Sequence, residues 1–305
     1  MVGFQFLHYP FPKAFSPVVH NPPRPPVIII GMHRSGTSMI TRILEAMGLF
    51  VGDQTDKNNR EALFFVRSND WLLNQSGGSW FDPEPIHDLL ESSQIRALAV
   101  DYLRCLLDSW HVCSFMGVSK YLRYRRPDNM PLPWGWKDPR STYILPLWLE
   151  IFPDAKIIHI RRHGVDVANS LKVRQQEALH RFKRSVFKCQ FRRFVNPFGP
   201  GLLGLFRCQT LDDFLLLWDK YVREADAHVS RLKDRAMNLG YEDFLSDPRR
   251  HMEQLACFCD LKVSGRELDR MAAQVNKDRA YAYRASPALT RFADTMAQSL
   301  RAHGY

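Results

Sequence analysis

The stretch from Val27 to Leu44, VIIIGMHRSGTSMITRIL, constrains the fold of this chain more than any other segment. Four β-branched residues, a pattern typical of a strand buried on both faces, lead into Gly31. Gly36 follows five residues later, and apolar residues then recur at helical spacing. A buried strand that enters a helix through a glycine-rich loop predicts an anion site, because the N–H groups at the helix start point at the loop.

This loop lacks the lysine of nucleotide triphosphatases. Their consensus is G-x-x-x-x-G-K-[ST], and Thr37 stands at the lysine position here. The loop cation is instead Arg34, while Thr37 and Ser38 offer hydroxyl donors, and no apolar strand ends in a clear magnesium-binding Asp. An NTPase is therefore disfavoured. The alternative interpretation is a tight strand-to-helix turn that binds nothing.

The composition is that of a basic globular protein. The 305 residues are 45% hydrophobic, and their formal charge of +10 favours anionic partners such as nucleic acid, anionic glycans or nucleotide phosphates. Six cysteines fall at no metal-ligand or disulfide-scaffold spacing, which fits a reduced, cytoplasmic compartment. No apolar run is long enough to span a membrane, and the N-terminus lacks the charged region of a signal peptide.

Strands alternate with helices along the chain, which predicts an α/β fold with a doubly wound, mostly parallel sheet. We expect residues 1–26 to form an extended lead-in and residues 27–305 to form one domain, with helical insertions at about 61–133 and 172–210. Segment 111–133 is predicted to be irregular. The predicted strands are 27–31, a short one at WGWK, 155–160 and 236–244, and the predicted helices are 38–47, 61–75, 88–109, one opening at 164, 211–234, 246–259 and 264–275.

A second strand-to-helix junction, IIHIRRHGVDVANSL, occupies residues 157–171. Arg162 is expected at the end of the strand, and Ser170 lies two turns along the helix. A bidentate guanidinium on one side and a hydroxyl on the other could grip one phosphate. The alternative is that Arg162 forms a structural ion pair with Asp166.

The two junctions together carry a family resemblance. GMHRSGTS resembles the 5′-phosphosulfate loop, and RHGVDVANS resembles the R-x-x-x-D-x-x-x-S 3′-phosphate motif, of sulfotransferases that use 3′-phosphoadenosine 5′-phosphosulfate (PAPS). WGWKDPR resembles the K-D-P segment of bacterial and tyrosylprotein members, and NNREALFFVRSNDWLLNQSGGSW resembles the segment after the loop in bacterial members. NLGYEDFLSDPRRHMEQLACF resembles the family's Y-E-D strand and helix, so the match covers about residues 27–260 in family order.

The resemblance implies a bacterial-type, P-loop-like sulfotransferase that moves the sulfuryl group of PAPS to a hydroxyl or amine and releases 3′,5′-ADP, with no metal required. The loop would then hold the 5′-phosphosulfate. Tyr241 resembles the family tyrosine near the adenine, or it is a core aromatic on a buried strand. The implied cofactor-binding residues are His33, Arg34, Ser35, Gly36, Thr37, Ser38, Arg162, Ser170 and Tyr241.

Sulfuryl transfer is an in-line displacement, in which the acceptor oxygen needs a base and the leaving oxygen needs fixed positive charge. We expect Lys137 and Arg34 to supply this charge. Glu61 is the leading candidate for the base, with Asp56 and His33 as alternatives. Glu61 could instead be an acid that only stabilises the first turn of a helix.

Several residues near these motifs are open to more than one interpretation. The chain lacks the K-T-H histidine and the R-K-G run of cytosolic small-molecule members, and Arg279 and Arg284 could substitute for the latter. Phe65 stands where many bacterial members have a Glu. Asp138 is expected to cap the helix that follows it, and Arg140 to pair with Asp138 or with a phosphate.

Residues 172–193 hold eight Lys or Arg and one Glu. They predict either an amphipathic helix with a solvated basic face or an acceptor-side wall for an acidic substrate such as a glycan. Carbohydrate, lipid, peptide and small phenol acceptors all remain open. Two other functional classes are weaker: a P-loop nucleotide kinase or NTPase, and a nucleic-acid-binding module, which would leave both junction motifs unused.

Overall fold

The computed structural model describes residues 23–56, 59–188 and 208–305. Within these residues, four parallel strands form one sheet in the order β2-β1-β3-β4, which confirms the predicted α/β fold with a parallel sheet. The register pairs Val27 with Gly135 on one side and with Lys156 on the other. The strands are β1 (Val27–Ile30), β2 (Gly135–Lys137), β3 (Lys156–Arg161) and β4 (Ala236–Gly240).

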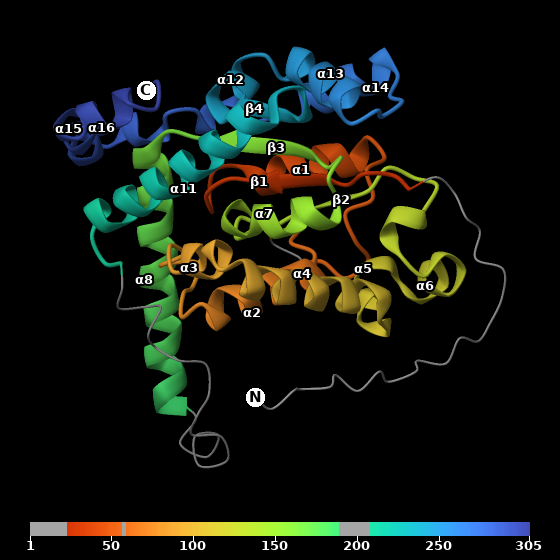
Figure 1. Ribbon diagram of the computed structural model, residues 1–305. Helices are drawn as coiled ribbons and strands as arrows, with labels where there is room; N and C mark the ends of the chain where they lie inside the picture. The colour runs from red at the N-terminus through yellow and green to blue at the C-terminus, as the bar shows by residue number, and fades with distance from the viewer. Residues whose placement is uncertain (1–22, 57–58, 189–207) are drawn as a thin grey trace, which may run out of the picture.

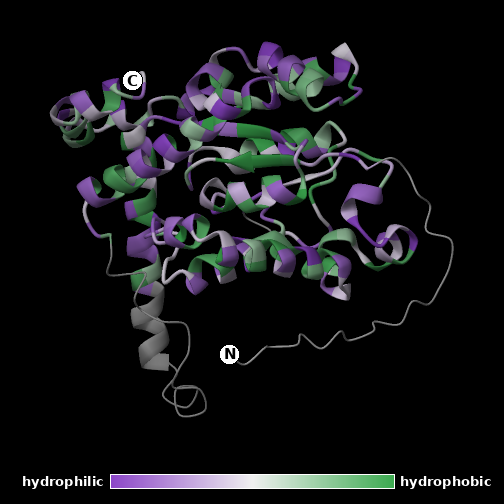
Figure 2. Ribbon diagram, in the orientation of Figure 1, coloured by the Kyte–Doolittle hydropathy of each residue, from purple (hydrophilic) through white to green (hydrophobic). Residues whose placement is uncertain are grey.

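Helices cover both faces of this sheet. Ile28 and Ile30 of β1 belong to one apolar cluster, whereas Val27 and Ile29 belong to another on the opposite face. Figure 1 shows α13 and α14 on one side of the sheet and α7 on the other, and Figure 2 shows hydrophobic residues along the strands between them. The covering helices are α7 (Ser141–Ile151), α8 (Gly164–Lys188) and α11 (Leu211–Leu232) on the first face, and α1 (Thr37–Ala46), α13 (Pro248–Phe258) and α14 (Gly265–Ala273) on the second.

A further helical layer lies below α7 in Figure 1. The prediction of one helix over 88–109 is wrong, because Ser92 has an extended backbone and its hydroxyl caps a new helix by accepting a hydrogen bond from the Ile95 N–H at 3.4 Å. The prediction of irregular structure over 111–133 is also wrong, since buried Phe115 and Met116 anchor a short helix there. The helices of this layer are α2 (Leu63–Gln75), α3 (Ile86–Glu91), α4 (Ser93–Asp108), α5 (Cys113–Met116) and α6 (Val118–Tyr124).

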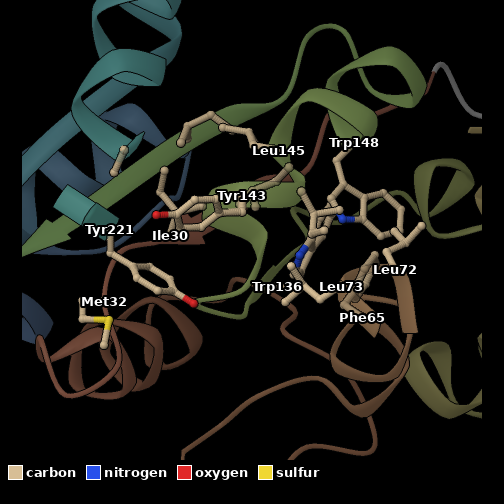
Figure 3. Packing of buried hydrophobic residues seen from close by; sticks show 14 of the residues in the cluster. Ile30, Met32, Phe65, Leu72, Leu73, Trp136, Tyr143, Leu145, Trp148 and Tyr221 are labelled. Carbon is tan, nitrogen blue, oxygen red and sulfur yellow. The ribbon is translucent and has the colours of Figure 1, made fainter. Parts of the chain in front are cut away.

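Phe65 belongs to the larger apolar cluster and lies near Trp136 and Trp148 (Figure 3). Its ring stacks on that of Trp136 with centroids 3.8 Å apart and meets Trp148 edge-on at 5.2 Å. Fully buried on α2, it has no access to a reacting group. The position that was compared above with a Glu of bacterial family members is therefore occupied here by a side chain that packs in the core.

Phe65→Ala is expected to lower the free energy of unfolding by about 3–5 kcal/mol, because it leaves a cavity beneath the stacked Trp136 ring. Chemical denaturation followed by tryptophan fluorescence measures this loss. Leu216→Ala is the matched control, since Leu216 is 59% exposed and its truncation should change stability by less than about 0.5 kcal/mol. Equal losses in the two variants would contradict the packing described for Phe65.

Three local predictions differ from the structure. Strand β4 ends at Gly240 rather than at residue 244, and Tyr241 begins α12 (Tyr241–Ser246), whose first turn is acidic. Asp138 does not cap a helix, because its buried carboxylate accepts hydrogen bonds from Asn69 and Arg140, and α7 begins only at residue 141. Helices beyond residue 275 were not predicted; they are α15 (Pro287–Thr295) and α16 (Ala297–Arg301).

The structure describes only part of the predicted division into an N-terminal lead-in and one domain with two insertions. Residues 1–22 of the expected lead-in and residues 189–207 of the second expected insertion lie outside the described ranges. Helix α8 carries the start of that insertion as far as Lys188. The assignment of residues 27–305 to one domain stays a prediction.

Candidate active site

The glycine-rich loop between β1 and α1 is held in its path by close backbone approaches. Gly31 and Gly36 have positive φ angles of 126° and 91°. A Cβ atom on Gly31 would lie 2.5 Å from the carbonyl oxygen of Ile160, and one on Gly36 would lie 2.3 Å from the ring of Tyr241. Both positions therefore require glycine, and the loop lies directly against the ends of β3 and β4.

The two predicted junction motifs meet in space. The Arg34 side chain donates a hydrogen bond from Nε to the hydroxyl of Ser170 at 2.8 Å. Arg162 donates from Nη1 to the carbonyl oxygen of Arg34 at 3.3 Å and lies 3.4 Å from the carboxylate of Asp166. Arg162 therefore forms the ion pair with Asp166 and contacts the loop at the same time. Its guanidinium also lies 4.7 Å from the ring centre of Tyr241.

Asp166 docks the C-terminal segment onto this junction. Its two carboxylate oxygens accept hydrogen bonds from the backbone N–H groups of Tyr283, at 2.8 Å, and Ala282, at 3.2 Å. Arg162 adds a hydrogen bond to the carbonyl oxygen of Arg279 at 3.2 Å. Arg279 consequently lines the same cavity as the loop, whereas the exposed Arg284 lies over the ring of Tyr281 outside it.

One cavity of about 870 Å³ joins these elements. Its volume is in the range of pockets that bind nucleotides and drug-sized molecules. Its basic residues outnumber its acidic residues, which are Glu61 and Asp166. The sequence-predicted residues that line it are His33, Arg34, Gly36, Thr37, Ser38, Glu61, Lys137, Arg162, Ser170 and Tyr241.

Lys137 and Glu61 form an ion pair at one side of the cavity. The Lys137 Nζ atom lies 2.9 Å from Oε1 of Glu61, and the two side chains are 1% and 12% exposed. Burial lowers the pKa of Lys137, and the neighbouring carboxylate of Glu61 opposes that shift. Among the described residues, Oε2 of Glu61 has no hydrogen-bond partner. The pair therefore presents a buried ammonium and a free carboxylate oxygen side by side.

The placement of Glu61 differs in detail from the sequence prediction. Helix α2 begins at Leu63, so Glu61 precedes its first turn instead of beginning it. Its carboxylate is engaged with Lys137, which disfavours the alternative of an acid that only stabilises the helix terminus. Asp56, the other acidic candidate, does not line the cavity and accepts a hydrogen bond from the Asn59 N–H.

Three buried polar atoms at the loop have no hydrogen-bond partner among the described residues. They are Nε2 of His33, Oγ of Ser35 and Nε of Arg162. Burial, and then the positive charge of Arg174, hold the pKa of His33 well below its usual value, so its imidazole is neutral at pH 7. An unsatisfied buried polar atom costs about 1–3 kcal/mol, which a bound anion with acceptor oxygens would offset.

The sequence did not determine the roles of two arginines near the site, Arg140 and Arg174. Arg140 pairs with Asp138 at 3.1 Å and with Asp70 at 3.2 Å, which favours the structural alternative for its role. Arg174 belongs to the basic stretch of residues 172–193, and it lines the cavity one helical turn beyond Ser170. The i+4 spacing of Arg174 after Ser170 was the sequence signal that could have identified it.

None of the helices in the described residues is long and apolar enough to cross a membrane. No three of the His, Cys, Asp or Glu side chains in the same described residues are grouped as metal ligands.

The chain is similar to a family model and to several solved structures. No curated protein is detectably similar to this sequence. Similar solved structures include a sulfotransferase domain from the curacin biosynthetic pathway (16% identity, 90% of this chain and 98% of that chain covered, TM-score 0.47). Others are sulfotransferases from Alicyclobacillus acidocaldarius (16%, 90% and 92%, TM-score 0.44) and Mycobacterium avium (16%, 92% and 77%, TM-score 0.41). The model of the sulfotransferase family matches residues 25–265, and the chain belongs to that family of transferases.

Proposed function

We propose that this protein transfers the sulfuryl group of PAPS to a hydroxyl or amine acceptor and releases 3′,5′-ADP. The observation that carries the proposal is the set of unpartnered buried polar atoms on His33, Ser35 and Arg162, which surround the loop where two basic motifs meet. These atoms and the excess of cations fit a ligand that carries anionic groups at two places.

The residues of the cavity divide between the two anionic groups of PAPS. Arg162 and Ser170 would hold the 3′-phosphate, because they lie at the carboxyl end of β3 and on the first turns of α8. The loop from His33 to Ser38, which enters α1, would hold the 5′-phosphosulfate through N–H groups and hydroxyls. Arg34 lies between them, bonded to Ser170.

Glu61 and Lys137 are proposed to act on the acceptor and the leaving group. PAPS supplies an activated sulfuryl group, and its sulfur–oxygen bond to the phosphate breaks as a new bond to the acceptor oxygen forms. The free Oε2 atom of Glu61 takes the acceptor hydroxyl proton. The buried ammonium of Lys137, together with Arg34, stabilises negative charge on the leaving phosphate oxygen.

A cytoplasmic location is part of the proposal. Among the described residues, four cysteines are free thiols: Cys105, Cys113, Cys257 and Cys259. Free thiols are typical of reducing compartments.

The proposal predicts selective stabilisation by 3′,5′-ADP. At about 100 times its Kd, a ligand adds about 2.7 kcal/mol, which should raise the Tm by roughly 3–6 °C. Thermal unfolding is measured with 3′,5′-ADP, ATP and a single-stranded oligonucleotide at equal concentrations. A larger shift with ATP would favour a kinase or NTPase, and a larger shift with the oligonucleotide would favour a nucleic-acid-binding module.

A further inference from the structure

Arg174 is a partly buried cation that the cofactor motifs leave unused. It lies on α8, four residues after Ser170 and therefore on the same face of the helix, and it lines the cavity. Its guanidinium lies 4.7 Å from the ring centre of Trp80. The same ring lies 4.6 Å from that of His33, so Trp80 supports both side chains.

No charge in the described part of the chain neutralises Arg174. It forms no ion pair or hydrogen bond there, in contrast to Arg34 and Arg162, which are bonded to Ser170 and Asp166. Glu61 is the acid that acts on it, and Lys137 already pairs with that carboxylate. Burial and, after it, the charge of Arg34 lower the pKa of Arg174 to about 10.

A partly buried guanidinium without a counterion is unfavourable, so the position of Arg174 favours a ligand that supplies an anion. The cavity holds two kinds of ligand under the proposed function. The 3′-phosphate motif runs from Arg162 to Ser170, and Arg174 lies one helical turn beyond its last residue along α8. Arg174 shares the Trp80 ring with His33, and after Arg34 the charge that acts most strongly on it is that of Glu61, the proposed base. We therefore assign Arg174 to the acceptor side of the cavity.

We propose that Arg174 binds an anionic group of the acceptor, so that the acceptor is an acidic compound with a carboxylate, sulfate or phosphate near its hydroxyl. This inference rests on the proposed function. Among the described side chains of the predicted acidic-substrate wall (residues 172–193), Arg174 is the charged one that lines the cavity.

Matched pairs of hydroxyl compounds test the inference by binding alone. The probes are 4-hydroxybenzoate against 4-hydroxybenzamide and glucuronate against glucuronamide, which differ in one charge. Each is titrated by calorimetry into the protein saturated with 3′,5′-ADP. In at least one pair the carboxylate should bind about tenfold or more tightly than the amide, and Arg174→Gln should remove that preference.

Lys172→Gln is the matched control, because it removes the same charge from the same helix at a residue that does not line the cavity. It should keep the preference for the carboxylate, and both variants should bind 3′,5′-ADP like the parent. Equal binding within every pair, a preference that survives Arg174→Gln, or weakened 3′,5′-ADP binding in that variant would overturn the inference. Failure of the parent protein to bind 3′,5′-ADP would count instead against the proposed function.

Discussion

Glu61→Gln is expected to lower the turnover of sulfuryl transfer by about 10²–10⁴ while leaving the affinity for 3′,5′-ADP nearly unchanged. The amide keeps the shape of the carboxylate and can still accept the hydrogen bond that Lys137 Nζ donates at 2.9 Å. It cannot take a proton from the acceptor. Steady-state release of 3′,5′-ADP, with cofactor affinity measured by calorimetry, separates the two effects.

The control for this variant is Glu84→Gln, which breaks a surface ion pair with Lys220 and should leave turnover unchanged. Lys137→Ala should also lower turnover, and it should weaken PAPS binding because Lys137 is proposed to contact the transferring group. The Lys137→Ala variant also removes the ion-pair partner of the Glu61 side chain, which is only 12% exposed. Parent-like turnover in Glu61→Gln would remove Glu61 as the base, and His33→Gln would then be the next variant to measure.

Arg162→Ala is expected to weaken 3′,5′-ADP binding by about 10–150-fold, which corresponds to one charged hydrogen bond of roughly 1.5–3 kcal/mol. Ser170→Ala should weaken it less, since a neutral hydroxyl contributes about 0.5–1.5 kcal/mol. Isothermal titration calorimetry measures both affinities. Unchanged affinity in both variants would show that the second junction does not bind the 3′-phosphate.

Arg161→Ala is the control for charge loss at the neighbouring position. Arg161 lies near Asp226 and over the ring of Tyr305 instead of lining the cavity. The Arg161→Ala variant should bind 3′,5′-ADP with the same affinity as the parent protein. Because Arg162 also bonds to the carbonyl oxygens of Arg34 and Arg279, the Tm without ligand is measured in parallel to separate lost binding from lost docking of the C-terminal segment.

The core of the site could be predicted because it depends on local patterns. Parallel strands bring their carboxyl ends to one edge of the sheet, so two strand-to-helix junctions on adjacent strands must lie close together. Strands β1 and β3 are such neighbours, and Arg34 and Ser170 therefore come into contact although 136 residues separate them. The two loop glycines could be identified from their spacing, and the neighbours that exclude a Cβ atom are the backbone of Ile160 at Gly31 and the ring of Tyr241 at Gly36.

The rest of the site depends on contacts that leave no local pattern. Glu61 and Lys137 are 76 residues apart, and the loop that carries Glu61 has no periodicity to place it. The C-terminal segment docks through backbone N–H groups bonded to Asp166, and backbone donors have no sequence signature. Asp138 resembles a helix cap in sequence, but its burial beside Asn69 and Arg140 overrides that local preference.

The most direct test of the central claim is the calorimetric affinity of the parent protein for 3′,5′-ADP compared with that for 5′-AMP, with ATP as a third ligand. The two adenosine monophosphate derivatives differ only in the 3′-phosphate, which Arg162 and Ser170 are proposed to hold at the end of β3. The account predicts that 3′,5′-ADP binds about tenfold or more tightly than 5′-AMP and that Arg162→Ala abolishes the difference. Equal affinities for 3′,5′-ADP and 5′-AMP, or tighter binding of ATP than of either, would contradict it.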